Sequence, residues 1–204
     1  MVEERGTSVS KPRSTARDEI LARVRDAIVG APTPDLPALQ PSGPVDIDLF
    51  VERVADYRAV VERCTPDQLA GHVAAAVEGS IVIPDGLTFD VEGAVVDDQL
   101  SAADLDAIDT VVTEARVGIA ETGTIVLDHG PGQGRRSISL VPDRHVCVIR
   151  EDQVVADVPD AVALLDPTRP LTWISGPSAT SDIELDRVEG VHGPRNLHVI
   201  VVSG

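Results

Sequence analysis

The sequence predicts an α/β protein with a mostly parallel central sheet flanked by helices. Three observations favour this class. The 204 residues are 43% hydrophobic but only 2% aromatic, so the core is expected to be aliphatic, as in buried parallel strands. From residue 79 onward, short apolar runs alternate with segments of helical pattern. Residues 120–150 hold three apolar runs with no room for helices between them, which indicates an antiparallel hairpin element there.

The N-terminal part is predicted to be helical and to precede the sheet. Residues 1–13 are polar and lack periodicity, so we expect a flexible tail. Residues 14–204 are expected to form a single domain, in which residues 14–78 are mainly helical and residues 79–204 form the sheet core. Prolines recur throughout residues 31–46, and their spacing excludes helix and central strand, so this stretch is predicted to be an extended connector.

Helices and strands are assigned from the period of the apolar residues. A helix over about 15–29 carries an apolar stripe that includes Ile20 and Val24, and Gly30 provides its stop. The other helices are expected at about 47–63, 65–78, 101–108 and 158–165, and just after Ser178. The expected strands are the apolar runs 81–83, 95–96, 111–112, 124–127, 138–141, 146–149, 171–174 and 197–202.

Charge and cysteine content exclude several classes of function. The net charge of −17 repels nucleic acid and anionic membranes, whether it reflects a high-salt habitat or only a biased genome. Apolar runs stay short of the about 20 residues that span a bilayer, and the first residues lack the hydrophobic segment of a secretory signal, so a cytoplasmic protein is expected. Cys64 and Cys147 are too few for an iron–sulfur cluster held by this chain alone, so we expect neither a metal nor a cofactor on it.

The first candidate functional segment precedes the apolar run 125–127. Glu121 is a candidate base or nucleophile, and Thr122, Gly123 and Thr124 are candidate substrate-binding residues beside it. The alternative is that Glu121 pairs with an arginine while the threonines simply favour a strand.

The second candidate segment, residues 175–184, follows a predicted buried strand. Gly176, Ser178, Thr180 and Asp182 are expected at a helix N-terminus, where backbone N–H groups bind phosphate or carboxylate. The alternative is an ordinary capped helix, with Asp182 complementing the helix dipole. That acidic residue also counts against a strongly anionic ligand.

Two further loops complete the candidate site. His192, which titrates near neutrality, and Gly193, which permits close backbone approach, precede the last predicted strand. Arg136 belongs to a glycine-rich loop that could close over an anion; a solvated loop is the alternative. If these loops all border strand ends, they should converge on one pocket, with Ser178 and Thr180 as anion donors and His192 as proton carrier beside Glu121.

Four motifs in order resemble one protein family. They are AETGTIVL at 120–127, RRSISLVPDRHVCVI at 135–149, ISGPSATSDIE at 174–184 and GVHGPRNLHVIVV at 190–202. Together they closely resemble the lactate-utilisation (LUD) domain family in its short protein C form, specifically over about 110–202 and more loosely over 15–109. The resemblance implies a fold similar to the ribose-phosphate isomerase and CoA-transferase group. One departure is Ala179, where relatives often place a basic residue, and it weakens the case for tight anion binding.

The resemblance implies a role in the oxidation of L-lactate to pyruvate. The chain would be a non-redox subunit without its own cofactor, acting with partner proteins that carry iron–sulfur clusters. One alternative is an independent enzyme of acyl or CoA transfer or of phosphorylated-ligand chemistry, because Glu121-Thr122-Gly123 looks like the glutamate motif of class I CoA transferases. Another alternative is a ligand sensor without catalysis.

Overall fold

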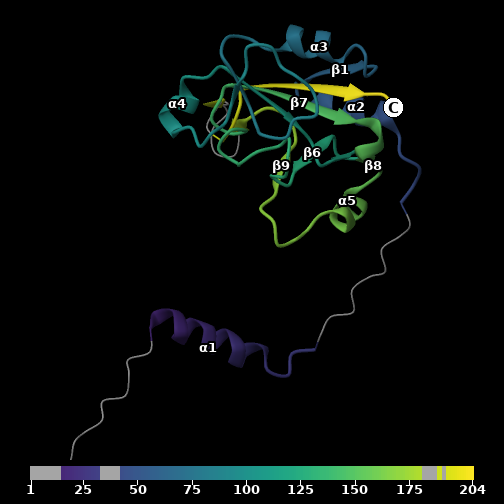
Figure 1. The fold of residues 1–204 in the computed structure, drawn as a ribbon. Helices are drawn as coiled ribbons and strands as arrows, with labels where there is room; N and C mark the ends of the chain where they lie inside the picture. The colour runs from purple at the N-terminus through teal and green to yellow at the C-terminus, as the bar shows by residue number, and fades with distance from the viewer. Residues whose placement is uncertain (1–14, 33–41, 181–187, 190–191) are drawn as a thin grey trace, which may run out of the picture. The chain divides into compact units, whose positions relative to one another are not determined.

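The computed structural model describes residues 15–32, 42–180, 188–189 and 192–204, and the chain divides into two compact units, residues 1–39 and 40–204. The first unit contains α1 (Ala16–Ile28) (Figure 1). Gly30 follows this helix with a φ of 73°, at the stop that the sequence predicts, and Thr15 caps the other end in a reciprocal capping box with Asp18. The predicted tail 1–13 and connector residues 33–41 lie outside the described residues.

A six-stranded parallel sheet forms the centre of the second unit. Its strand order is β1-β12-β7-β4-β2-β3, and every neighbouring pair is parallel. The bounds are β1 (Val60–Cys64), β2 (Ile81–Ile83), β3 (Val95–Val96), β4 (Thr110–Glu114), β7 (Arg144–Arg150) and β12 (Asn196–Val202). The long central strands β7 and β12 are almost wholly buried, which explains their continuous apolar runs.

A smaller four-stranded sheet packs beside the central one. Its order is β8-β5-β6-β9, with β5 (Val117–Ile119), β6 (Thr124–Leu127), β8 (Val154–Val155) and β9 (Thr172–Ile174). The pairs β5/β6 and β6/β9 are antiparallel. The antiparallel element expected around 120–150 therefore exists, but it spans 117–127 and recruits β9, whereas β7 joins the parallel sheet.

Aliphatic side chains fill both faces of the central sheet. On one face, α3 (Leu69–Ala76) contributes Val73 to a cluster with Val146 and Ile200. On the other face, α2 (Ile47–Asp56) and the smaller sheet contribute Phe50 and Ile125. Figure 1 shows this layering, with α3 on one side of β7 and β12, and β6, β8 and β9 on the other.

Two predicted elements near the N-terminal side of the second unit are wrong in extent. The helix expected over 47–63 ends at Asp56; Arg58 takes a φ of 68°, and the chain continues as β1. The apolar period suggested one helix because Phe50 and Val54 face the core, yet Val61 belongs to a strand paired with β12. The helix expected from residue 65 begins at Leu69, although the Gln68 side chain does accept the Thr65 amide.

The short elements show where local signals succeed and where they fail. Ser101 caps α4 (Ala102–Asp106), and Asp157 caps α5 (Val158–Leu164), close to the predicted bounds. A one-turn 3₁₀ helix, η1 (Glu151–Gln153), follows β7. The strand expected at 138–141 is a series of turns, in which the amides of Leu140 and Val141 both donate to the Ser137 carbonyl.

The chain does not begin a helix at Ser178. Ala179–Thr180 form β10, which pairs antiparallel with β11 (Val188–Glu189). The predicted helix N-terminus is therefore wrong at its start, and the rest of that segment, 181–187, lies outside the described residues. Among the described residues, no helix is long and apolar enough to cross a membrane.

Candidate functional site

A pocket of about 350 Å³ brings together residues from three loops of the second unit. It lies at the carboxyl end of β9 and at the amino ends of β7 and β12. Five residues that the sequence marks as candidates line it: Arg136, Gly176, Ser178, His192 and Gly193. The structure therefore brings together the loop of Arg136, the loop of Gly176 and Ser178, and the loop of His192 and Gly193.

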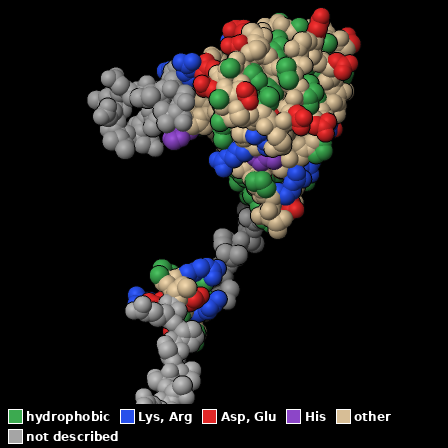
Figure 2. All heavy atoms as spheres, turned by 60° about the vertical axis from the view of Figure 1, so that its left-hand side comes forward, with side chains coloured by type: hydrophobic (Ala, Val, Ile, Leu, Met, Phe, Trp, Pro, Cys, Tyr) green, Lys and Arg blue, Asp and Glu red, His purple; other side chains and the backbone are tan. Residues whose placement is uncertain are grey.

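The charge of this pocket is opposite to that of the chain. Its lining contains Arg136, His145 and His192, and no Asp or Glu stands among the described lining residues. Arg136 is exposed, and within the described part of the chain no carboxylate forms an ion pair with it. Figure 2 shows acidic side chains over much of the face in view, in keeping with the net charge of −17, whereas the lining of this pocket carries the positive charge of Arg136. Such a local excess of positive charge attracts small anions.

Backbone hydrogen bonds hold two of the loops against each other. The Ser178 amide donates to the Pro194 carbonyl at 2.8 Å, and the Ser178 hydroxyl accepts the His192 amide at 3.2 Å. The Ser178 hydroxyl oxygen therefore accepts one hydrogen bond from within the loop, and this bond holds the backbone of His192 in position. The side chain of His192 is exposed. The predicted role of Ser178 as an anion donor remains a prediction, because its hydroxyl proton is not used by this bond.

Gly176 is required by both conformation and space. Its φ is 84°, a left-handed value, and a Cβ at this position would lie 2.5 Å from Cβ of Tyr57. The loop after β9 can thus pass directly over the end of α2 only with glycine there. This close approach sets the wall of the pocket.

A chain of hydroxyl groups connects the first candidate segment to the pocket. Thr124 Oγ1 lies 2.8 Å from Thr122 Oγ1 and 2.8 Å from Ser175 Oγ. Thr124 is 5% exposed, and Ser175 lines the pocket. Thr122 and Thr124 therefore support the pocket wall from β6, while Gly123, at a φ of 60°, packs against the backbone of Arg53.

Glu121 lies apart from His192. It is exposed and lines a different cavity of about 270 Å³, together with Asp46 and Asp157. Three carboxylates beside one another disfavour a carboxylate or phosphate ligand there. Of the remaining predicted residues, Thr180 lies in β10 and Asp182 lies outside the described residues.

His145 is a pocket residue that the sequence reasoning missed. It is the second residue of β7, is 1% exposed, and lines the pocket. Its Nε2 lies 2.8 Å from Thr113 Oγ1, and the Thr113 hydroxyl donates to Cys147 Sγ at 3.8 Å. The available signal was a single histidine opening an apolar run, which is more often a core residue than a ligand-binding one.

Thr113 links His145 to Cys147, and this link favours one tautomer of the ring. With its proton directed at Cys147 Sγ, the Thr113 oxygen accepts the Nε2–H of His145, and Nδ1 is then the unprotonated nitrogen. No other described residue bonds to the ring. Burial lowers the pKa of His145 to about 4, so the imidazole is neutral at physiological pH. The pocket therefore contains a cation and a neutral nitrogen acceptor.

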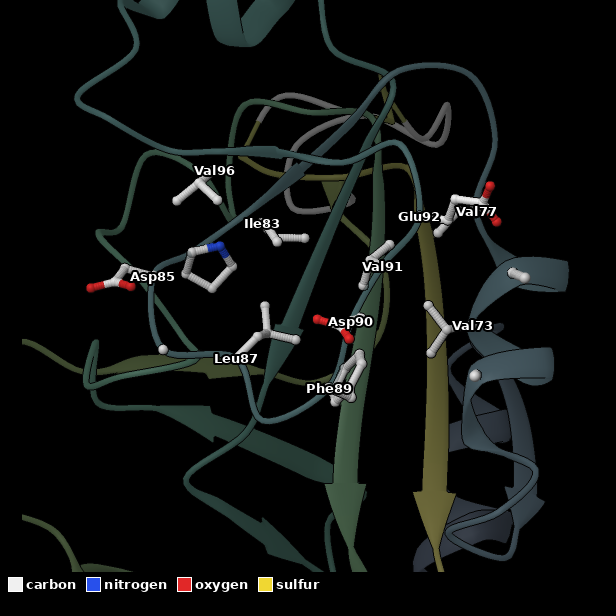
Figure 3. A pocket seen from close by; sticks show the side chains of 14 residues that line it. Val73, Val77, Ile83, Asp85, Leu87, Phe89, Asp90, Val91, Glu92 and Val96 are labelled. Atoms are coloured by element: carbon white, nitrogen blue, oxygen red, sulfur yellow. The ribbon is translucent and has the colours of Figure 1, made fainter.

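A second cavity, of about 650 Å³, has a different character (Figure 3). It lies between α3 and residues 83–92, and side chains such as Val73, Leu87 and Val91 surround it. In Figure 3 the carboxylates of Asp85 and Glu92 point away from this apolar group. Its described lining residues include no histidine or arginine, and its charged groups are the carboxylates of Asp85, Asp90 and Glu92, so it does not suit an anionic ligand.

Comparison with known proteins gives consistent matches. The family model described as LUD domain matches residues 90–202. "Lactate utilization protein C" of Deinococcus radiodurans is 44% identical over 203 residues, covering 92% of this chain and 96% of the relative. "Lactate utilization protein C" of Bacillus subtilis is 34% identical over 100 residues, covering 45% of this chain and 41% of the relative.

A solved structure agrees with the fold. The crystal structure of a "duf162 family protein" from Deinococcus radiodurans superposes with a TM-score of 0.67 at 39% identity. The match covers 78% of this chain and 99% of that chain. The matched family region, residues 90–202, includes Arg136, His145 and His192.

Proposed function

This chain belongs to the LUD-domain family, and from that premise we propose that it serves lactate utilisation in the cytoplasm by binding a small 2-hydroxy carboxylate between Arg136 and His145. The names of its relatives support the pathway, and the charge of the pocket supports the ligand class. The observation that carries the proposal is the pairing of a cation with a neutral imidazole acceptor in one pocket of about 350 Å³.

The carboxylate of the ligand would bind Arg136. A guanidinium presents two parallel N–H donors that match the two oxygens of a carboxylate. Arg136 is exposed and has no ion-pair partner among the described residues, so no internal ion pair has to break when the ligand arrives. The exposed imidazole of His192 provides a second donor near the same rim.

The hydroxyl of the ligand would donate to His145 Nδ1. A 2-hydroxy acid carries a hydroxyl donor on the carbon next to its carboxylate, whereas the corresponding 2-oxo acid and the unsubstituted acid carry none. Because His145 is buried and its Nε2–H is held by Thr113, the acceptor is fixed in position before the ligand binds. This arrangement favours lactate over propionate, since binding without the hydroxyl leaves a buried acceptor unsatisfied.

Oxidation itself would require partner proteins. Converting lactate to pyruvate removes two electrons and two protons, and we infer that iron–sulfur partner proteins accept the electrons while this chain acts as a non-redox subunit. Because the pKa of His145 is about 4, its imidazole would hold the ligand hydroxyl by a hydrogen bond and would not remove its proton, so both protons of the oxidation would leave with the partner proteins or to solvent. An anaerobic pull-down that recovers iron-containing proteins with this chain would support the partnership.

Genetic complementation tests the proposed function. A lactate-utilising bacterium that lacks its own copy of the gene would receive this chain or its Arg136→Gln variant, with L-lactate as the carbon source. We expect growth with the unchanged chain and little growth with the variant at equal protein levels. Equal growth with both would contradict the role of the pocket.

An independent acyl-transfer enzyme using Glu121 is the alternative that the motif Glu121-Thr122-Gly123 supports. The same complementation experiment distinguishes acyl transfer by Glu121 from ligand binding by Arg136. Glu121→Gln keeps the side-chain shape and removes the charge, and it lies outside the pocket of Arg136. Loss of growth with Glu121→Gln, together with normal growth with Arg136→Gln, would favour the acyl-transfer reading.

A further inference from the structure

Another polar cavity, of about 320 Å³, lies at the carboxyl end of β7, whereas the pocket lined by Arg136 lies at the amino end of that strand. It is bordered by Glu114 and Arg150, the last residues of the adjacent parallel strands β4 and β7. The two pockets share no lining residue. In open α/β sheets, the crevice outside the carboxyl ends of the strands is the usual place for a ligand.

Three guanidinium groups line this cavity: those of Arg116, Arg150 and Arg169. Two carboxylates also line it, Asp128 and Glu114, so the lining carries one excess positive charge (three minus two) in a chain whose net charge is −17. Glu114 already accepts the Thr88 hydroxyl. Such a concentration of arginine is not explained by the overall composition.

Most of the arginine donors are not committed to other groups. Asp128 Oδ2 lies 3.3 Å from Nη1 of Arg169 and 3.8 Å from Nε of Arg116, and Arg150 Nε lies 2.9 Å from an oxygen of Asp152. Each guanidinium has five N–H donors, so these contacts use a minority of them. The Arg150 pair is exposed, which makes it weak and easily exchanged for a ligand.

A partly shielded amide adds a further donor to the cavity. Gln133 is 5% exposed and lines the same cavity. Its Oε1 accepts the Asp128 amide at 2.7 Å, which fixes the orientation of the side chain. No described residue accepts a hydrogen bond from its Nε2. Among the described residues only His198 Nε2 is a buried side-chain atom without a partner, so Gln133 Nε2 is accessible and can donate to a group in the cavity.

We propose that this cavity is a binding site for a phosphate group. A single arginine satisfies a planar carboxylate, whereas donors from three separate arginines and one amide suit the several oxygens of a tetrahedral phosphate. Asp128 orients Arg116 and Arg169 in this site, and Arg150 is the cation that the ligand recruits from the surface. The site is independent of the 2-hydroxy acid pocket.

Calorimetric titration at constant ionic strength tests this site. Inorganic phosphate, glycerol phosphate and acetate would each be titrated into the full chain and into its Arg150→Gln variant. We expect both phosphates to bind more tightly than acetate, and the variant to lose about tenfold or more in phosphate affinity, equivalent to about 1.4 kcal/mol. Tighter binding of glycerol phosphate than of inorganic phosphate would identify a phosphorylated compound as the ligand; the reverse order would identify the free anion.

Control variants keep the result interpretable. Arg150 pairs only with exposed Asp152 among the described residues, so its replacement should leave folding unchanged, whereas replacing Arg169 would expose the buried Asp128. Arg53→Gln, which alters another exposed pair outside the cavity, should bind phosphate like the unchanged chain. Equal phosphate affinity in Arg150→Gln and the unchanged chain, or acetate binding as tight as phosphate, would overturn the proposal.

Discussion

His145 lies between the core and the pocket lined by Arg136: it is 1% exposed, lines the pocket, and its Nε2 lies 2.8 Å from Thr113 Oγ1 on the neighbouring strand. In the sequence it opens an apolar run, and such a histidine is ordinarily read as a core residue. The assignment to the core is correct, because His145 is buried. The sequence does not show, however, that His145 forms a hydrogen bond with Thr113 of β4. Thr113 and His145 are 32 positions apart and meet only because β4 and β7 are neighbours in the sheet. By contrast, glycine-flanked residues such as His192 and Gly176 were identifiable because loop composition is a local signal.

The low pKa of His145 predicts a pH dependence of stability. Burial lowers the pKa of this imidazole from 6.5 to about 4, so the unfolded chain binds more protons than the folded chain between these values. The contribution to the free energy of unfolding is present above pH 6.5 and is lost as the pH falls toward 4, by about 1.4 kcal/mol per pH unit for one proton. Urea unfolding at pH 7.5 to 4.5 should show this slope.

The His145→Gln variant is the comparison for that measurement. Its stability should depend less steeply on pH over the same interval, whatever its absolute stability. Burial also lowers the pKa of His198, so some slope will remain in the variant. Identical slopes in the variant and the unchanged chain would show that His145 does not titrate in this way.

At the scale of elements, the apolar runs 81–83, 95–96 and 124–127 coincide with β2, β3 and β6, and the errors lie where distant partners decide the structure. Thr15, Ser101 and Asp157 cap their helices through hydrogen bonds to residues three positions on, so the signal is contained in a few adjacent residues. The misassigned segments 57–63 and 138–141 depend on distant partners. Residues 60–64 become a strand because β12 supplies their hydrogen bonds, and residues 138–141 receive no such partner.

Gly176→Ala should destabilise the protein and distort the pocket. The left-handed φ of 84° and the 2.5 Å approach to Tyr57 Cβ leave no room for a methyl group, so we expect a loss of about 1–3 kcal/mol in the free energy of unfolding. Gly71→Ala is the matched control, because that exposed helical glycine has open space around it and alanine should stabilise it by about 0.5–1 kcal/mol. Chemical denaturation of both variants measures the difference; a neutral Gly176→Ala would mean that the loop path is not constrained as described.

Thr124→Val tests the hydroxyl chain between β6 and the loop after β9. Removing the hydroxyl breaks two side-chain hydrogen bonds of 2.8 Å at a position that is 5% exposed, and we expect a cost of about 1–2 kcal/mol. Affinity for the ligand should also fall, since Ser175 lines the pocket. Thr168→Val, at an exposed turn, should change stability by less than about 0.5 kcal/mol. Equal melting temperatures of the two variants would show that the Thr124 hydroxyl does not stabilise the protein.

For the molecule as a whole, composition was enough to predict the class of fold. The aliphatic, aromatic-poor sequence fits a parallel sheet with buried central strands, and in the six-stranded sheet of the structure β4, β7 and β12 are almost wholly buried, whereas the edge strand β3 is exposed. The separate four-stranded sheet was not predictable, because β8 and β9 are short and join β5 and β6 only through long-range pairing. Those pairings also decide which candidate residues share a pocket, and they explain why Glu121 lies apart from His192.

The purified chain alone should contain no iron. Cys64 and Cys147 are both buried, and burial raises the pKa of both thiols, that of Cys147 to about 12. Clusters usually require about four thiolates, so these two side chains are too few and too protonated to hold one. Metal analysis and the visible spectrum of protein purified without partners measure this. Stoichiometric iron with a charge-transfer band would contradict it.

Calorimetric titration with L-lactate measures whether the Arg136 pocket binds a 2-hydroxy carboxylate. We expect saturable binding to the unchanged chain, binding of propionate weaker by about tenfold or more, and a similar loss of lactate affinity in Arg136→Gln. Arg53→Gln, outside the pocket, should bind lactate normally. Unchanged lactate affinity in Arg136→Gln, or propionate binding as tight as lactate binding, would show that this pocket does not recognise a 2-hydroxy carboxylate.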